Sequence, residues 1–319
     1  MTLLHDRLAD LPPCDTATHQ AVVERAAQIL RPGGALAWLD ATAAWVAGWQ
    51  RTDRPAIERP AGIIFAADHG VAAAGVSAYP PEVTAGMLAA FEAGQATINA
   101  FARAAGAKLR AVDVGVGRPT GDIRVEAAMT PKRFDAVVQQ AFEAIDALDC
   151  DLLVLGEMGI GNTTPSAAIV ASLAGGEAAS WVGRGTGVDD EGLRRKADAV
   201  EAAQRRIAGI TDPIEVLREV GGAELAAIAA ATIAARHRSI PVVLDGYVTT
   251  AAVLPLAMIN PSSLEHCIVG HCSAEPGHRK LLDLDMRLGE GSGAMAAVPL
   301  IRMACAGISE VPTFTEFFA

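Results

Sequence analysis

The sequence contains few aromatic residues and few cysteines. Aromatic side chains make up 4% of its 319 residues, whereas hydrophobic residues make up 51%. This composition is sufficient for a sizeable core, in which small side chains bring helices and strands close together. The length allows two domains, or one α/β domain with a helical subdomain.

Positive charge is also scarce. Lys and Arg total 26 against 37 Asp and Glu, which gives a formal net charge of -11. Nucleic acids require a basic binding face, so a nucleic-acid partner is not expected. No stretch of about 18 residues is free of Gly, Pro and charge, and the N-terminus lacks a signal-peptide pattern. We therefore expect a cytoplasmic protein without a membrane partner.

The five cysteines do not form a CxxC pair of the kind found in zinc sites. Cys267 and Cys272 flank His271, but residues five apart in a strand point to opposite faces. We expect no metal site and predict reduced, mostly buried thiols. The cysteines are Cys14, Cys150, Cys267, Cys272 and Cys305.

Short apolar runs that end in glycine or a polar residue alternate with alanine-rich segments long enough for crossover helices. This alternation predicts an α/β fold with a parallel, Rossmann-like sheet flanked by helices. We expect residues 1–55 and 289–319 to form a smaller helical subdomain, and residues 56–288 to form a large α/β domain that carries the nucleotide and base sites. The apolar runs are residues 62–70, 109–117, 151–161, 241–247 and 267–273.

Polar residues cluster where these predicted strands end. In open parallel sheets, ligands bind at the carboxyl ends of the strands, so this clustering indicates a binding site. Each residue taken alone is also compatible with an ordinary strand end. The polar residues are Asp68, His69, Asp113, Glu157, Asp245, His271, Cys272 and Ser273.

Residues 155–165 join an apolar strand to a helical pattern through a glycine-rich turn. Thr164 is a suitable N-cap, and Pro165 suits the first helical position. Free backbone N–H groups and the helix dipole would then attract an anion. An ordinary strand–helix turn and a phosphate site are both compatible with this pattern.

A second glycine loop, residues 182–187, precedes Arg194, Arg195 and Lys196. Three adjacent cations indicate either a solvated helix face or one side chain that reaches a phosphate oxygen. A third motif, residues 271–278, contains His271, Glu275 and His278, which suit acid–base chemistry or a turn after a strand.

Glu290 lies between two glycines in residues 287–293. A carboxylate in such a setting has few side chains to solvate it, and burial would raise its pKa into the range of a general base. The alternative is a solvated acid at a helix start that Ser292 caps.

Together these segments resemble the nicotinate-nucleotide–dimethylbenzimidazole phosphoribosyltransferases of cobalamin biosynthesis, from roughly Arg31 to the C-terminus. The residues GEMGIGNTT and SAEPGH, in this order, are the most specific markers. The segments that carry the resemblance are residues 68–71, 80–84, 119–122, 156–164, 181–183, 244–247, 270–280 and 287–293.

The resemblance implies a homodimer that binds small molecules and uses no metal or other cofactor. It implies transfer of the 5-phosphoribosyl group of nicotinate mononucleotide to 5,6-dimethylbenzimidazole, which gives α-ribazole 5'-phosphate and nicotinate. Glu290 would be the general base. The nucleotide and its phosphate would be held by Glu157, Gly159, Ile160, Gly161, Asn162, Thr163, Lys196, Gly185 and Thr186, and the base by Ser273, Leu288, Gly86 and Ala78.

The chemistry of this reaction requires a single base. Nicotinate leaves from a cationic pyridinium and needs no general acid, while the attacking benzimidazole must lose its N–H proton. Glycosidases, in contrast, need two carboxyl groups.

The sequence departs from the family where Gly86 replaces a usual Gln. Adenine, another benzimidazole or a phenol therefore remain alternative acceptors. A catalytically silent nucleotide-binding homologue is the alternative from a different class.

Overall fold

The computed structural model describes residues 2–271, 286 and 288–319. These residues form a five-stranded parallel sheet in the order β2-β1-β3-β4-β5. One strand lies in each of the five predicted runs, so the parallel α/β fold is confirmed. The strands are β1 (Pro60–Ala67), β2 (Lys108–Gly115), β3 (Leu152–Met158), β4 (Val242–Leu244) and β5 (Cys267–Val269).

The strand order reverses between β1 and β3, the two central strands. Every residue of β1 is buried, as is all of β3 except its last residue. Such continuous burial explains why these runs lack alternating polarity: both faces of the sheet are covered. A reversal point of this kind leaves a crevice at the carboxyl ends of the strands, which is where ligands bind in open α/β sheets.

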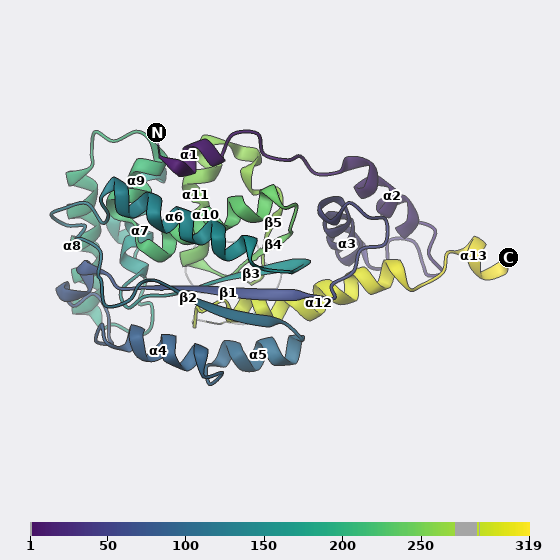
Figure 1. Cartoon of the computed structure of the whole chain (residues 1–319), viewed down its shortest axis with the longest axis horizontal. Helices are drawn as coiled ribbons and strands as arrows, with labels where there is room; N and C mark the ends of the chain where they lie inside the picture. Colours follow the sequence, from purple (N-terminus) through teal and green to yellow (C-terminus); the bar gives the residue numbers. More distant parts are fainter. Residues whose placement is uncertain (1, 272–285, 287) are drawn as a thin grey trace.

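One face of the sheet is covered by a helical layer in which α6 (Pro131–Asp146) and α10 (Ala223–His237) lie next to each other (Figure 1). Helix α10 is buried from Ala223 to Arg236, and its alanines allow this close packing. The same layer contains α1 (Leu3–Arg7), α7 (Thr163–Ala174), α8 (Asp190–Arg206), α9 (Pro213–Val220), α11 (Tyr247–Ile259) and the 3₁₀ turns η2 (Ala178–Ser180) and η3 (Pro261–Leu264).

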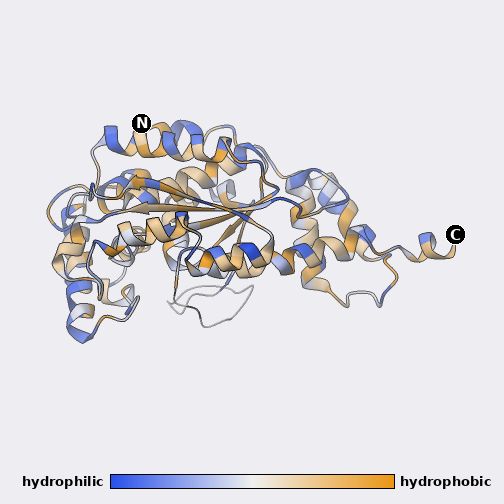
Figure 2. Ribbon diagram, turned by 60° about the horizontal axis from the view of Figure 1, so that its bottom comes forward, coloured by the Kyte–Doolittle hydropathy of each residue, from blue (hydrophilic) through white to orange (hydrophobic). Residues whose placement is uncertain are grey.

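The opposite face is covered by α4 (Val83–Glu92), α5 (Thr97–Ala105) and the first half of α12 (Ser292–Ser309). The 3₁₀ turn η1 (Gly70–Ala74) follows β1. Hydropathy follows this layering, since the central strands are hydrophobic and the hydrophilic residues lie mainly on the surrounding helices and loops (Figure 2).

Segments near the two ends of the chain, residues 16–50 and the second half of α12, meet beyond the sheet. Helices α2 (Thr16–Ala26) and α3 (Ala37–Gln50) pack against the second half of α12, and α13 (Phe314–Phe318) lies at the same end (Figure 1). Ile29 pairs with Thr313 in an isolated bridge, and Arg25 binds Glu316. Helix α1, in contrast, packs on α6, so the first residues of the chain contact the α/β core.

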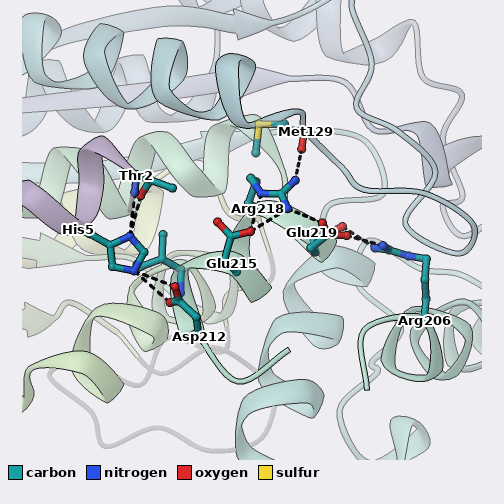
Figure 3. Close-up of polar contacts among 9 residues, drawn as sticks. Thr2, His5, Met129, Arg206, Asp212, Glu215, Arg218 and Glu219 are labelled. Atoms are coloured by element: carbon teal, nitrogen blue, oxygen red, sulfur yellow. Dashed lines mark hydrogen bonds and ion pairs between the residues drawn. The ribbon is translucent and has the colours of Figure 1, made fainter. Parts of the chain in front are cut away.

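A polar network holds α1, α8 and α9 on the outer surface (Figure 3). His5 Nε2 lies 3.0 Å from an Asp212 oxygen at the start of α9. Arg218 donates to the Met129 carbonyl at 2.8 Å, and Glu219 pairs with both Arg218 and Arg206. These contacts attach α9 to its neighbours.

Helix α12 is the one described helix long and apolar enough to cross a membrane by composition alone. It is 56% buried within the molecule, and it contains Pro299 and Arg302. Arg302 donates to the Ile57 carbonyl at 2.9 Å. Packing against the sheet and α3 accounts for the apolar composition of α12.

Candidate active site

A cavity of about 760 Å³ opens at the carboxyl ends of β3, β4 and β5. Residues at the end of each strand or just after it contribute to the cavity wall: Glu157 and Met158 in β3, Asp245 and Gly246 after β4, and His271 after β5. The cavity therefore lies at the edge of the sheet where the polar residues were predicted to gather.

The glycine-rich turn after β3 forms one wall of this cavity, with residues 159–163. Gly161 has a φ of 89°, in the region that favours glycine. The Asn162 backbone N–H donates to the Gly159 carbonyl at 3.1 Å, which closes the turn. Two glycines in this wall allow a ligand to approach the backbone closely, as anion binding requires.

Helix α7 begins earlier than predicted, so the expectation that Thr164 is its N-cap is wrong. The N-cap is Asn162, and Pro165 is the third helical residue. The tight turn at Gly161 already directs the chain into the helix at Thr163. The Asn162 side chain donates to Glu157 and is therefore not used for capping.

Lys196 joins the two glycine loops. Its Nζ donates to Thr163 Oγ1 at 2.9 Å and to the Gly183 carbonyl at 2.7 Å, and the residue is 1% exposed. A Cβ atom on Gly185 would lie 3.5 Å from this Nζ. The structure thus brings Lys196, Thr163 and Gly185 together, and Thr186 also lines the cavity.

The two cations adjacent to Lys196 lie elsewhere. Arg194 is exposed, and Arg195 Nε donates to the Gly75 carbonyl at 2.8 Å. The start of α8 therefore presents one buried lysine to the loops. It is not a uniformly solvated basic face.

Glu157 ends β3 and is buried. One of its carboxylate oxygens accepts a hydrogen bond from the Asn162 side-chain amide. Burial raises the pKa of Glu157 to about 8, and the charge of Glu224 adds to the effect.

Glu290 lies on the short loop before α12 and is 6% exposed. Burial raises its pKa to about 7, a hydrogen bond from the Ile98 backbone acts in the opposite direction, and Asp245 adds to the rise. Its Oε2 is buried and has no hydrogen-bond partner among the described residues. The alternative of a solvated helix-start acid is therefore wrong, and the N-cap of α12 is Gly291 rather than Ser292.

The loop that carries Glu290 is held against β3. Gly289, Glu290 and Gly291 have φ values of 75°, 64° and 90°, so three consecutive residues are left-handed. A Cβ atom on Gly156 of β3 would lie 2.0 Å from the Glu290 carbonyl oxygen. Glycine in the strand thus makes room for the loop.

Asp245 holds the start of α12 from the end of β4. Its oxygens accept hydrogen bonds from Ala294 N at 2.8 Å and Gly291 N at 3.3 Å. His271 Nδ1 lies 3.5 Å from Asp245 Oδ1. Burial raises the pKa of Asp245, and His271 opposes that rise. The sequence located Asp245 at the ligand-binding edge, but local spacing does not indicate contacts 46 and 49 residues away.

The residues expected to bind the base do not all line the cavity. Leu288 lines the cavity and is 44% exposed. Gly86 and Ala78 are exposed and are not among the lining residues. Ser273 lies outside the described residues, as do Cys272, Glu275 and His278.

Apolar side chains that sequence reasoning did not select line the cavity near these positions. They are Val76, Tyr79, Val83, Met87 and Met158. Val83 and Met87 are four residues apart on α4, so they share one helix face, and Gly86 is turned about 100° away from Met87. The helical spacing of the two apolar residues was the signal available in the sequence.

Within residues 2–271, 286 and 288–319, no group of three His, Cys, Asp or Glu side chains is arranged to hold a metal ion. The acids in the cavity wall are Glu157, Asp245 and Glu290, and the cations are Lys196 and Arg184. The arrangement provides a backbone anion site near Lys196 and buried carboxyl groups near β3 and α12.

A family model described as a phosphoribosyltransferase matches residues 11–317. The sequence, fold and site therefore define the chain as a phosphoribosyltransferase. The match begins about 20 residues before the segment that the motifs indicated.

Curated relatives show which kind of phosphoribosyltransferase the chain resembles. The nicotinate-nucleotide–dimethylbenzimidazole phosphoribosyltransferase of Mesorhizobium japonicum is 49% identical over 317 residues, which cover 96% of this chain and 94% of the relative. The enzyme of the same name from Methylorubrum extorquens is 46% identical, with coverage of 98% and 94%. The crystal structure of CobT from Thermus thermophilus matches with a TM-score of 0.90 at 40% identity and covers 95% of this chain and 99% of that structure. The chain belongs to the nicotinate-nucleotide–dimethylbenzimidazole phosphoribosyltransferase family.

Proposed function

We propose that this enzyme transfers the 5-phosphoribosyl group of nicotinate mononucleotide to 5,6-dimethylbenzimidazole, with α-ribazole 5'-phosphate and nicotinate as products. One observation carries the proposal: the cavity wall contains both the glycine loops joined by Lys196 and a buried glutamate, Glu290, one of whose oxygens has no hydrogen-bond partner among the described residues. Family membership supports the same reaction.

The nucleotide phosphate is assigned to residues 159–163, 185 and 186. The Thr163 N–H lies at the positive end of the α7 dipole, whereas Thr164 N donates to the Gly161 carbonyl at 3.0 Å and Pro165 has no N–H. Lys196 supplies the positive charge, and its bonds to Thr163 and Gly183 fix the ammonium group between the loops. Glu157 lies two residues before the loop, where its carboxyl group can bind the ribose.

Glu290 is assigned as the general base, with Leu288 and the apolar residues of α4 around the acceptor. A carboxyl group with a pKa of about 7 is partly ionised at neutral pH and still a strong enough base to take an azole N–H proton. The other azole nitrogen attacks C1′ on the face opposite nicotinate. This inverts the β-nucleotide to the α-product, and the pair of electrons in the broken bond stays on the ring nitrogen of nicotinate, which changes from a cationic pyridinium to a neutral pyridine nitrogen.

Other acceptors remain candidates because of Gly86. A Cβ atom at this position would meet no described atom within 4 Å, so the region where the family usually has Gln is open. Gly86 itself does not line the cavity, so adenine, a different benzimidazole or a phenol are alternatives because the family's usual Gln side chain is absent. We further propose that the enzyme is a cytoplasmic homodimer that requires no cofactor, as the resemblance to the family implies.

The test is incubation of the purified enzyme with nicotinate mononucleotide and a panel of bases, with products identified by mass spectrometry. We expect nicotinate release and α-ribazole 5'-phosphate formation with 5,6-dimethylbenzimidazole. Preferential use of another base would replace the proposed acceptor. Tight nucleotide binding without nicotinate release for any base would instead favour the catalytically silent homologue.

A further inference from the structure

A buried histidine–glutamate pair lies beneath the first glycine of the nucleotide loop. His69 follows β1 and Glu224 lies in the first turn of α10, and both side chains are 0% exposed. His69 Nε2 and Glu224 Oε1 are 2.6 Å apart. His69 Nδ1 and Glu224 Oε2 have no partner among the described residues.

Gly159 rests directly on this pair. A Cβ atom on Gly159 would lie 2.8 Å from His69 Nε2 and 3.1 Å from Glu224 Oε1. The loop backbone therefore follows the surface that the two side chains form. Gly159 lines the cavity, so a change in the position of the His69 or Glu224 side chain would move this part of the cavity wall.

The backbone around His69 is fixed from both sides. The Asp68 side chain accepts a hydrogen bond from Gly117 N at 2.7 Å, and Gly70 N donates to Thr120 Oγ1 at 3.3 Å. The position of the imidazole is therefore set by the sheet edge and not by the nucleotide loop. His69 provides a fixed support against which the loop is placed.

The next residues of the loop have supports of their own. Ile160 N donates to Thr84 Oγ1 at 3.2 Å, and Gly161 packs on Ala72 of η1. The pair, Thr84 and η1 thus hold consecutive residues, but only the pair consists of ionisable groups. Glu224 also raises the pKa of Glu157, so it influences the ribose side of the site.

Stability does not explain why ionisable groups occupy this position. A buried ionic pair is usually no more stabilising than apolar side chains of the same volume, and it is often less so. Removal of one partner alone leaves an uncompensated buried charge and is strongly destabilising. The pair therefore adds little to folding that leucine residues could not supply.

We infer that the His69–Glu224 pair is a positioning element for the nucleotide, which sets the place of Gly159 and through it the phosphate-binding turn. The inference rests on the proposed function. His69 and Glu224 act through the loop and are positioning residues, because they do not line the cavity.

The experiment compares Glu224→Gln with the double variant His69→Leu/Glu224→Leu. Glu224→Gln keeps the size and one hydrogen bond to His69, whereas the double variant replaces both charged partners and leaves no lone buried charge. For the double variant we expect the KM for nicotinate mononucleotide to rise by about tenfold, as for the loss of one hydrogen bond. The KM for the base and kcat should change by less than about threefold. Glu224→Gln should retain most of the nucleotide affinity.

Glu219→Leu is a matched control, since Glu219 is a largely buried acid paired with Arg206 and does not line the cavity (Figure 3). It should lower the thermal midpoint and leave the nucleotide KM unchanged. An unchanged nucleotide KM in the double variant, or equal rises in the KM values for nucleotide and base, would overturn the inference while wild-type transfer still supports the proposed function. A wild-type enzyme that neither binds the nucleotide nor releases nicotinate would overturn both.

Discussion

At the scale of single residues, the two buried glutamates of the cavity differ in the partners that surround them. Glu157 accepts a hydrogen bond from Asn162 and has a pKa of about 8. Glu290 has an unpartnered oxygen among the described residues and a pKa of about 7. At neutral pH a larger fraction of Glu290 is ionised, and no described residue donates a hydrogen bond to its buried Oε2. These differences favour Glu290 as the base.

Glu290→Gln should lower kcat by roughly 10²–10⁴-fold, because it removes the proton acceptor and keeps the side-chain shape. The KM for nicotinate mononucleotide should change little. In the parent enzyme, kcat should rise with pH through about 7, since deprotonation of a group whose pKa is raised creates the active form. Steady-state kinetics across pH measure both effects.

The variant should lose this acidic limb. A well-folded Gln variant that keeps more than about a tenth of parental kcat would contradict the role of general base. Glu157 would then be the next carboxyl group to test.

Lys196→Ala should raise the KM for nicotinate mononucleotide far more than that for the base. Loss of a charge-assisted hydrogen bond to phosphate costs on the order of 1.5–3 kcal/mol, or about 10- to 100-fold. Arg194→Ala is the matched control, because Arg194 is an exposed cation on the same helix. Steady-state kinetics with the concentration of each substrate varied separately would give the KM for the nucleotide and the KM for the base in both variants. Equal effects of the two substitutions would count against the assignment of Lys196.

At the scale of elements, the start of α12 connects helix capping with catalysis. The residues at its N-terminus supply no side-chain cap, and Asp245 accepts hydrogen bonds from two of its backbone amides instead. The group that caps α12 therefore lies directly after β4. This contact fixes the position of Glu290 relative to β3 and β4.

Asp245→Ala should destabilise the protein by about 1–3 kcal/mol, because buried amides lose their acceptor. Asp245→Asn retains one acceptor oxygen and should cost less. The Asn variant should also shift the acidic limb of the kcat profile to lower pH, since removal of a negative neighbour lowers the pKa of Glu290. Denaturant unfolding and pH profiles of both variants provide the measurement. A limb that stays in place or moves to higher pH would show that Asp245 does not act electrostatically on Glu290.

The sequence allowed the strands to be predicted more completely than the contacts between them. Apolar runs and glycine punctuation are local, and each of the five runs contains a strand of the parallel sheet. The contacts of Asp245 with α12 and of His69 with Glu224 join residues 46 to 155 positions apart. No local periodicity encodes such pairs. Gly86 and Ala78 came from the resemblance alone, and in the structure their neighbours Val83, Met87 and Tyr79 line the cavity.

At the scale of the whole molecule, the ends of the chain pack together beside the α/β core. Phe314, Phe317 and Phe318 remain 48%, 59% and 75% exposed at this end. Apolar side chains grouped on a surface are typical of protein interfaces. The family resemblance implies a homodimer, and this surface is compatible with one.

Sedimentation equilibrium should therefore give about twice the chain mass of 32.9 kDa at micromolar concentration. Phe317→Ser/Phe318→Ser should be compared with the parent, because it removes exposed rings without disturbing a buried core. A parent protein with the mass of a single chain throughout the concentration range would contradict the dimer.

The backbone conformation of Glu290 lowers the stability of the folded protein, whereas its side chain is assigned to catalysis. An L-residue at a φ of 64° is strained by about 1 kcal/mol relative to glycine, and glycines with φ above 70° lie on both sides. Glu290→Gly should therefore unfold at a higher temperature than the parent while it loses its activity, as calorimetry beside a turnover assay would show. Selection for thermal resistance alone would favour this loss, so any programme that stabilises the enzyme must screen for product at the same time.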